Sequence, residues 1–201
     1  MRTVSRRSLL RDTALAAAGA SMIEASSALA NASEAAETSE AALEPDVVAI
    51  TLRINGVTRT LAVEPRMTLA EALRGPLGLT GTKIACNRGA CSACTVLLDG
   101  NPVCSCMTLA IETQEHQITT IEGLAQGETL HPVQAAFIEH DALQCGFCTP
   151  GMVMSCAALL ARNPAPTARE VEAAISGHFC RCGTYPHVVA ATLAAAKARK
   201  A

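Results

Sequence analysis

The residues of this sequence best able to do chemistry are its ten cysteines, most of which are clustered. Three of them fall within the nine residues from Cys86 to Cys94, and Cys180 and Cys182 are separated by one residue. Disulfide bonds stabilise a chain most when they close long loops, so this crowding argues against a disulfide framework. Several thiolates held at short, fixed spacings are what a metal centre requires. The cysteines therefore predict metal binding.

The first set of thiols has the spacing of a plant-type [2Fe–2S] ferredoxin, Cys86-x4-Cys91-x2-Cys94. Such a cluster takes four thiolates, and Gly89 allows the loop to turn tightly so that backbone N–H groups face the cluster sulfurs. The fourth ligand is Cys104 or Cys106, which an extended segment would place on one face because side-chain direction repeats every two residues. The spacing alone does not choose between them. Zinc is the alternative metal.

A second set of four thiols occupies the stretches QCGFCTPG and HFCRCGTYP. It consists of Cys145, Cys148, Cys180 and Cys182. Four cysteines could also hold a tetrahedral zinc ion. A thioredoxin-like motif needs a βαβ context, which is missing, and haem attachment is excluded because no Cys-x-x-Cys is followed by His. The spacing favours a second iron–sulfur cluster over zinc.

The elements that must position the first set are strands around one helix. Residues 47–65 alternate between apolar and polar on both sides of Asn55-Gly56, which predicts a β-hairpin. Thr68 is the expected N-cap of a short helix. Further strands are expected at 95–98 and 116–124. This half of the chain is therefore predicted to be a small α+β domain.

The elements that must position the second set are helices. Four segments after Gly127 have helical spacing: 131–141, 151–163, 167–177 and 186–200. Thr167 and Glu170 form the pattern of a capping box, and Pro186 suits a first-turn position. Both cysteine pairs of the second set fall at junctions between these helices, so a compact helical bundle is expected to bring them together.

The N-terminus is predicted to be a targeting segment. Arg6-Arg7 precede a short apolar stretch at 13–23, which is below the roughly 20 residues that a membrane-spanning helix needs. A small-residue cleavage site follows at residues 28–30. The pattern resembles a twin-arginine signal, with an ordinary secretory signal as the alternative. We therefore expect a signal peptide at 1–30, a flexible linker at 31–45, and a mature protein in the periplasm.

Composition excludes several function classes. The net charge is −2, aromatic residues make up 2% and there is no Trp, so neither a phosphate-tracking groove nor a base-stacking platform is suggested. We expect no nucleic-acid partner and no membrane span in the mature chain. No nucleophile–base pair or G-x-G-x-x-G fingerprint is present, so no catalytic residue is predicted.

Four stretches together resemble the iron–sulfur small subunit of the xanthine dehydrogenase and aldehyde oxidoreductase family of molybdenum hydroxylases: CNRGACSACTVLLDG, SCMTLA, QCGFCTPGM and CRCGTYP. The resemblance implies an α+β fold in which a β-grasp, plant-type ferredoxin-like domain at 46–124 is followed by an all-α four-helix domain at 125–201, each holding one [2Fe–2S] cluster. It selects Cys106 over Cys104 as the fourth ligand of the first cluster. It also places Gln144 against the pterin of a molybdopterin cofactor.

The resemblance further implies the function of an electron-transfer subunit. Electrons would pass from molybdopterin on a large partner subunit to the cluster at Cys145, then to the cluster at Cys86, and then to an FAD-binding subunit or a cytochrome c. An exported aldehyde oxidoreductase is the expected complex. An N-heterocycle hydroxylase acting on isoquinoline or purine-type substrates, and a free-standing periplasmic two-cluster ferredoxin, are the alternatives. Ala85 and Ser92 depart from the family, which has glycine at both positions.

Overall fold

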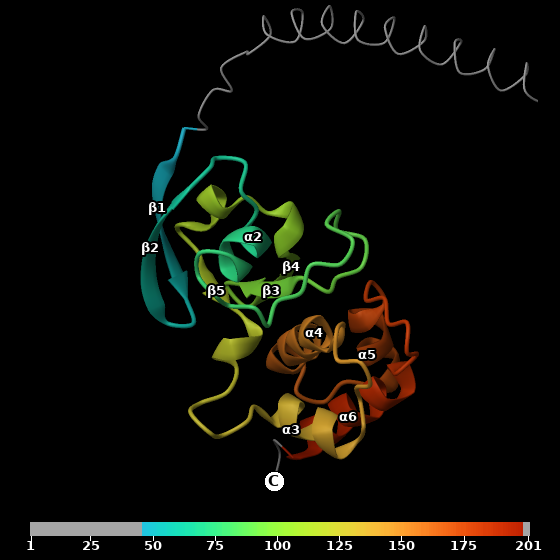
Figure 1. Ribbon diagram of the computed structural model, residues 1–201. Coiled ribbons are helices and arrows are strands. Elements are labelled where there is room, and N and C mark those ends of the chain that lie inside the picture. Colours follow the sequence, from blue (N-terminus) through green and yellow to red (C-terminus); the bar gives the residue numbers. More distant parts are fainter. Residues whose placement is uncertain (1–45, 199–201) are drawn as a thin grey trace, which may run out of the picture. The chain divides into compact units, whose positions relative to one another are not determined.

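The computed structural model describes residues 46–198. The predicted signal peptide at 1–30 and linker at 31–45 lie outside the described residues. Within 46–198, a five-stranded sheet with one α-helix is followed by four further α-helices. Figure 1 shows the sheet half and the helical half of this part of the chain. The predicted α+β class, a β-grasp sheet followed by a four-helix domain, is confirmed.

The first two strands form the predicted hairpin. β1 (Val48–Ile54) and β2 (Val57–Val63) are antiparallel, with Ile54 opposite Val57. Asn55 and Gly56 both have positive φ, 52° and 79°, which is the backbone that a two-residue hairpin turn requires. Alternate β1 residues point into the core, because side chains of a strand alternate between its two faces.

The sheet has the order β2-β1-β5-β3-β4, with β1 parallel to β5 (Gln117–Thr119). β3 (Thr95–Leu98) is confirmed, whereas β4 (Asn101–Cys104) was not predicted. A second positive-φ turn at Asp99 and Gly100 folds β4 back on β3, and Pro102 is tolerated because β4 is an edge strand.

The strand predicted at 116–124 is shorter than expected. β5 spans Gln117–Thr119, and Ile121–Gly123 is a turn of 3₁₀-helix. The strand ends because Thr120 forms its hydrogen bonds with the Asn55 side chain instead of with a neighbouring strand. The Asn55 side-chain oxygen accepts from the Thr120 backbone N–H at 2.9 Å, and the Asn55 side-chain NH₂ donates to the Thr120 hydroxyl at 2.9 Å.

Helix α2 (Leu69–Arg74) packs its apolar side on the sheet. Thr68 caps it as predicted and forms a capping box with Glu71. Leu69 and Leu73 are fully buried against Leu52 and other core residues of the sheet. The helix therefore ends over the sheet, and the loop that carries the first cysteines begins there.

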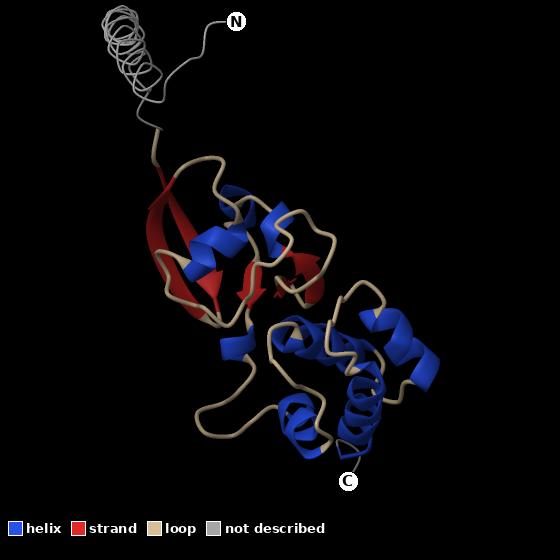
Figure 2. Cartoon of the chain, turned by 45° about the vertical axis from the view of Figure 1, so that its right-hand side comes forward, coloured by secondary structure: helices blue, strands red, loops and turns tan. Residues whose placement is uncertain are grey.

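The second half is the predicted set of helices, shown in blue in Figure 2. They are α3 (Pro132–Glu139), α4 (Thr149–Arg162), α5 (Ala168–Ile175) and α6 (Tyr185–Ala198). Their shared core contains Phe137, Met152 and Leu160, each at most 1% exposed. No helix within 46–198 has the length and apolar content needed to span a membrane.

Helix α4 also packs on the sheet. Leu97 of β3 lies in one buried cluster with Met154 and Ala158 of α4, which lies beside β3 in Figure 1. Because α4 begins directly after Cys148, this contact fixes part of the second cysteine set relative to the first.

The capping box at the start of α5 gives a first testable prediction. The Thr167 hydroxyl accepts from the Glu170 N–H at 3.3 Å, and the Glu170 carboxylate accepts from the Thr167 N–H at 2.7 Å. Thr167→Ala should lower the free energy of unfolding in urea by about 1 kcal/mol, because the helix loses its N-cap acceptor. Arg169→Ala, an exposed change in the same helix, should have little effect. Equal stability of the two variants would contradict this assignment.

Candidate metal centres

The loop between α2 and β3 carries the first cysteine set and is held at its base by side chains. The Arg74 guanidinium donates to the carbonyl oxygens of Thr80 and Thr82, at 2.7 Å each. The Gly81 N–H donates to the Glu122 carboxylate at 2.8 Å. The loop has no regular secondary structure, and these hydrogen bonds hold its base in place. The cysteines that follow are therefore held in a defined position.

The four predicted thiols of this set meet in pairs. Cys86 is in hydrogen-bonding contact with Cys91, and Cys94 with Cys106. The Gly89 N–H points at the Cys106 sulfur at 3.4 Å, as expected for a loop that turns its N–H groups toward sulfur. A [2Fe–2S] cluster places two protein ligands on each of two irons, and two thiol pairs fit that demand.

The thiols of the first set differ in acidity. The backbone N–H of Arg88 and then the Cys91 thiol lower the pKa of Cys86 to about 7. Burial raises the pKa of Cys106 to about 11, although the Gly89 N–H acts in the opposite direction. Without metal the Cys106 thiol therefore stays protonated at neutral pH, and a metal ion would supply the positive charge that keeps it as a thiolate.

The expectation that Cys104 and Cys106 share one face of an extended segment is wrong. The strand ends at Cys104, and Ser105–Met107 is a turn of 3₁₀-helix. The two sulfurs consequently have different neighbours. Cys106 is 5% exposed and contacts Cys94, whereas Cys104 donates to the Gly89 carbonyl oxygen at 3.8 Å and lies 3.9 Å from the Ser92 hydroxyl.

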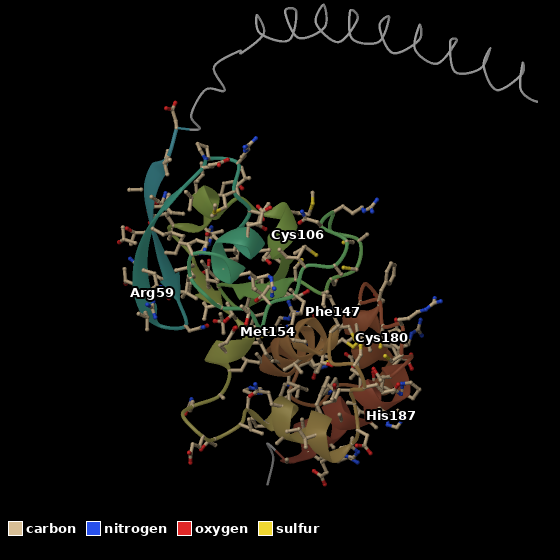
Figure 3. All side chains as sticks on the ribbon, viewed as in Figure 1. Arg59, Cys106, Phe147, Met154, Cys180 and His187 are labelled. Atoms are coloured by element: carbon tan, nitrogen blue, oxygen red, sulfur yellow. The ribbon has the colours of Figure 1, made fainter. Side chains whose placement is uncertain are left out.

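The second set lies at the predicted helix junctions. Cys145 and Cys148 directly precede α4, and Cys180 and Cys182 lie between α5 and α6. Cys148 and Cys180 are in hydrogen-bonding contact across the two junctions. Figure 3 shows Cys180 in the helical half and Cys106 in the sheet half. The α4 N-terminus at Cys148 favours negative charge, as a bound thiolate requires.

Burial and hydrogen bonds again set the acidities. Burial first, and then the neighbouring Cys180 thiol and Cys145 charge, raise the pKa of Cys148 to about 12. Burial also acts to raise the pKa of Cys180, but hydrogen bonds led by the Thr184 hydroxyl at 3.3 Å outweigh it and lower that pKa to about 7. Each set thus combines a thiol whose pKa is lowered to about 7, Cys86 or Cys180, with a buried thiol whose pKa is raised, Cys106 or Cys148.

The remaining residues of interest are placed as follows. Gln144 is exposed beside the exposed Cys145. Cys156 is fully buried on α4, as expected of a small apolar side chain, and burial raises its pKa to about 11. Ser92 adopts φ 54°, a left-handed conformation that favours glycine, so the departure from the family is accommodated at some backbone strain.

The two cysteine loops touch each other. The Phe179 N–H donates to the Cys91 carbonyl oxygen at 3.2 Å. Cys91 belongs to the first set, and Phe179 directly precedes Cys180 of the second. One hydrogen bond between main chains therefore joins the two candidate metal centres.

One buried side chain near the second set, His178, was not singled out from the sequence. It is 4% exposed, and its Nε2 lies 2.7 Å from the Ser155 hydroxyl. Burial lowers the pKa of His178 to about 4, so its ring is neutral at pH 7. No local sequence pattern predicts this hydrogen bond, because Ser155 and His178 are 23 residues apart.

The donor set fits [2Fe–2S] clusters. The four thiols of the first set meet in two pairs and receive the Gly89 N–H, and in the second set the Cys148 and Cys180 thiols are in contact. Within residues 46–198, no group of three or more His, Cys, Asp or Glu side chains has the spacing of a single-ion site.

Comparison with protein families agrees with this division of the cysteines. The family described as a 2Fe-2S iron-sulfur cluster binding domain matches residues 52–125. The family described as a [2Fe-2S] binding domain matches residues 120–193. The chain is therefore an iron–sulfur protein with two [2Fe–2S]-binding domains.

Known relatives identify the family more closely. The chain is 41% identical over 204 residues to the aldehyde oxidoreductase iron–sulfur-binding subunit PaoA of Escherichia coli O157:H7, covering 94% of this chain and 86% of that protein. It is 50% identical over 148 residues to the nicotine 6-hydroxylase small subunit of Paenarthrobacter nicotinovorans, covering 74% and 89%. Quinoline 2-oxidoreductase from Pseudomonas putida 86 superimposes with a TM-score of 0.74 at 49% identity, covering 77% of this chain and 96% of that chain. The chain belongs to the two-[2Fe–2S] small subunits of the molybdenum hydroxylase family and is an electron-transfer subunit.

Proposed function

We propose that this chain is the electron-transfer subunit of a molybdenum-containing aldehyde oxidoreductase, exported to the periplasm by the twin-arginine pathway. The match to the aldehyde oxidoreductase subunit supports this proposal, because it covers 94% of the chain and so includes part of residues 1–45. The matches to the N-heterocycle enzymes cover 74% and 77%.

The proposed ligands of the cluster nearer the acceptor are Cys86, Cys91, Cys94 and Cys106, and those of the cluster nearer molybdopterin are Cys145, Cys148, Cys180 and Cys182. When bound, such clusters accept and release single electrons. The chain itself holds them in place, shields them from water through the burial of Cys94, Cys106 and Cys148, and directs the Gly89 N–H at sulfur.

The observation that carries the proposal is the hydrogen bond from the Phe179 N–H to the Cys91 carbonyl oxygen. It gives a short route from a proposed ligand of one cluster to the residue beside a ligand of the other. A connection of this kind suits a chain that passes electrons from one cluster to the other.

Exposed apolar side chains lie near each cysteine set, and we assign a different partner subunit to each group. Leu143 and Phe147, 39% and 47% exposed, flank Gln144 and Cys145, and an apolar surface of this kind suits a protein partner. We assign it to the molybdopterin-binding large subunit, with Gln144 against the pterin. Near the first cysteine set, Met107 is 63% exposed and its side chain lies beside Gly89. We assign this surface to the FAD-binding subunit or the cytochrome c that would receive the electrons.

An N-heterocycle hydroxylase is the second candidate, because the identities to the nicotine and quinoline enzymes, 50% and 49%, exceed the 41% to the aldehyde oxidoreductase subunit. The substrate is bound by the partner subunit in either case. The chain's own residues therefore serve both candidates equally.

Purification of the tagged, full-length chain with its co-expressed partners tests the proposal. We expect molybdenum, iron and acid-labile sulfide to co-purify, and aldehydes to bleach the visible absorption of the clusters anaerobically. Gln144→Ala should slow this bleaching while leaving the iron content unchanged. A chain that emerges alone with iron but no molybdenum would support the free-standing ferredoxin instead. Bleaching by N-heterocycles alone would favour the second candidate.

A further inference from the structure

The segment that donates the bridging hydrogen bond has no regular secondary structure. It runs from Gly177 to Cys180, between α5 and α6. The Phe179 side chain is 65% exposed, so it does not anchor its own backbone. Something else must hold the Phe179 N–H within 3.2 Å of the Cys91 carbonyl oxygen.

Two side chains anchor this segment on either side of Phe179. His178 is 4% exposed, and its Nε2 forms a 2.7 Å hydrogen bond with the hydroxyl of Ser155 on α4. The Tyr185 hydroxyl donates to the His178 carbonyl oxygen at 3.0 Å and accepts from the Cys180 N–H at 2.8 Å. Of these anchors, only the His178–Ser155 bond ties the segment to α4.

Helix α4 contacts the first cysteine loop on the same face that carries Ser155. Gly151 and Ser155 are four residues apart, and residues at this spacing are neighbours on a helix surface. A Cβ at Gly151 would collide with the Ser92 carbonyl oxygen and would lie 3.3 Å from Ala93. One turn of α4 therefore contacts the first cysteine loop directly and the second through His178.

We propose that His178, bound to Ser155, is a positioning residue for electron transfer between the two clusters, because it fixes the Phe179 N–H against Cys91. The proposal rests on the proposed function of the chain as a two-cluster electron carrier. In this role the His178 side chain does not contact a cluster, and the role does not depend on the partner subunits.

The test uses the full-length holoprotein with whatever subunits accompany it. Ser155→Ala removes only the hydroxyl, and His178→Phe keeps a ring that cannot bond to Ser155. Thr192→Val is the matched control, because it removes another fully buried hydroxyl of the helical half, one that donates to the Val188 carbonyl oxygen of its own helix. Iron and sulfide content, both midpoint potentials by EPR-monitored titration, and the rate of electron equilibration between the clusters after rapid photoreduction are measured.

We expect Ser155→Ala and His178→Phe to slow equilibration between the clusters severalfold, with cluster content and potentials as in the parent and in Thr192→Val. An unchanged rate in Ser155→Ala would overturn the proposal. Loss of a cluster in Ser155→Ala would also overturn it, since the bond would then serve folding rather than positioning. The measurement needs neither molybdenum nor substrate, so failure of the aldehyde oxidoreductase assignment would be seen separately, in the co-purification experiment.

Discussion

Cys106→Ala will remove one of the two [2Fe–2S] clusters, whereas Cys104→Ala will leave both. The reason lies in how Gly89 faces the two sulfurs. Its N–H points at Cys106 at 3.4 Å and would stabilise a thiolate there. Its carbonyl oxygen accepts from Cys104 at 3.8 Å, and ionised Cys104 would lose that bond and face an oxygen instead. Cys106 also meets Cys94, as a shared iron requires.

Iron and acid-labile sulfide per chain measure this result. Cys106→Ala should lose about half of each, because one of two clusters is gone. Cys104→Ala is the matched control, since it removes a thiol two residues away in the same segment. Full cluster content in Cys106→Ala would mean that Cys104 can take over as the ligand, and it would contradict the assignment.

Gly151→Ala will destabilise the protein even though alanine is the better helix former. Glycine in a helix interior is less favourable than alanine by roughly 1 kcal/mol, so helix propensity alone predicts a gain. The added Cβ, however, would collide with the backbone carbonyl of Ser92, which cannot rotate away as a side chain could. We expect the free energy of unfolding to fall by about 1–3 kcal/mol, the usual cost of overpacking.

Urea denaturation measures the change, with Gly177→Ala as the control. A Cβ at Gly177 would lie 3.3 Å from the Ser92 side-chain oxygen, which can move. This variant should therefore cost less. The visible spectrum of Gly151→Ala should also show weakened cluster binding, because the same collision displaces the first cysteine loop. A stabilised Gly151→Ala would show that α4 and this loop do not approach as closely as described.

Much of the local structure could be predicted because its causes lie within a few residues. Asn55-Gly56 defined a hairpin because both residues tolerate positive φ. Thr167 and Glu170 defined a helix start because the capping box is a four-residue pattern. The division of the cysteines into two sets followed from their spacing, although the choice of Cys106 over Cys104 came from the resemblance to the family. The structure brings members of each set into contact.

Other features depend on the tertiary structure and could not be predicted. The turn at Ser105–Met107 separates Cys104 from Cys106, and nothing in the residues SCM distinguishes it from an extended segment. Strand β4 is four residues long and contains Pro102, so its pairing with β3 gave no strand signal. The contact of His178 with Ser155 joins residues on different elements and exists only because α4 packs against both cysteine loops.

Electron paramagnetic resonance of the reduced holoprotein shows whether the protein carries two neighbouring [2Fe–2S] clusters. Together with iron and sulfide analysis, it reports whether two [2Fe–2S] clusters are present and whether they lie close to each other. We expect two distinguishable signals after reduction with dithionite, with magnetic interaction between them because one hydrogen bond joins the two cysteine loops. A colourless protein that contains zinc and gives no such signals would contradict it.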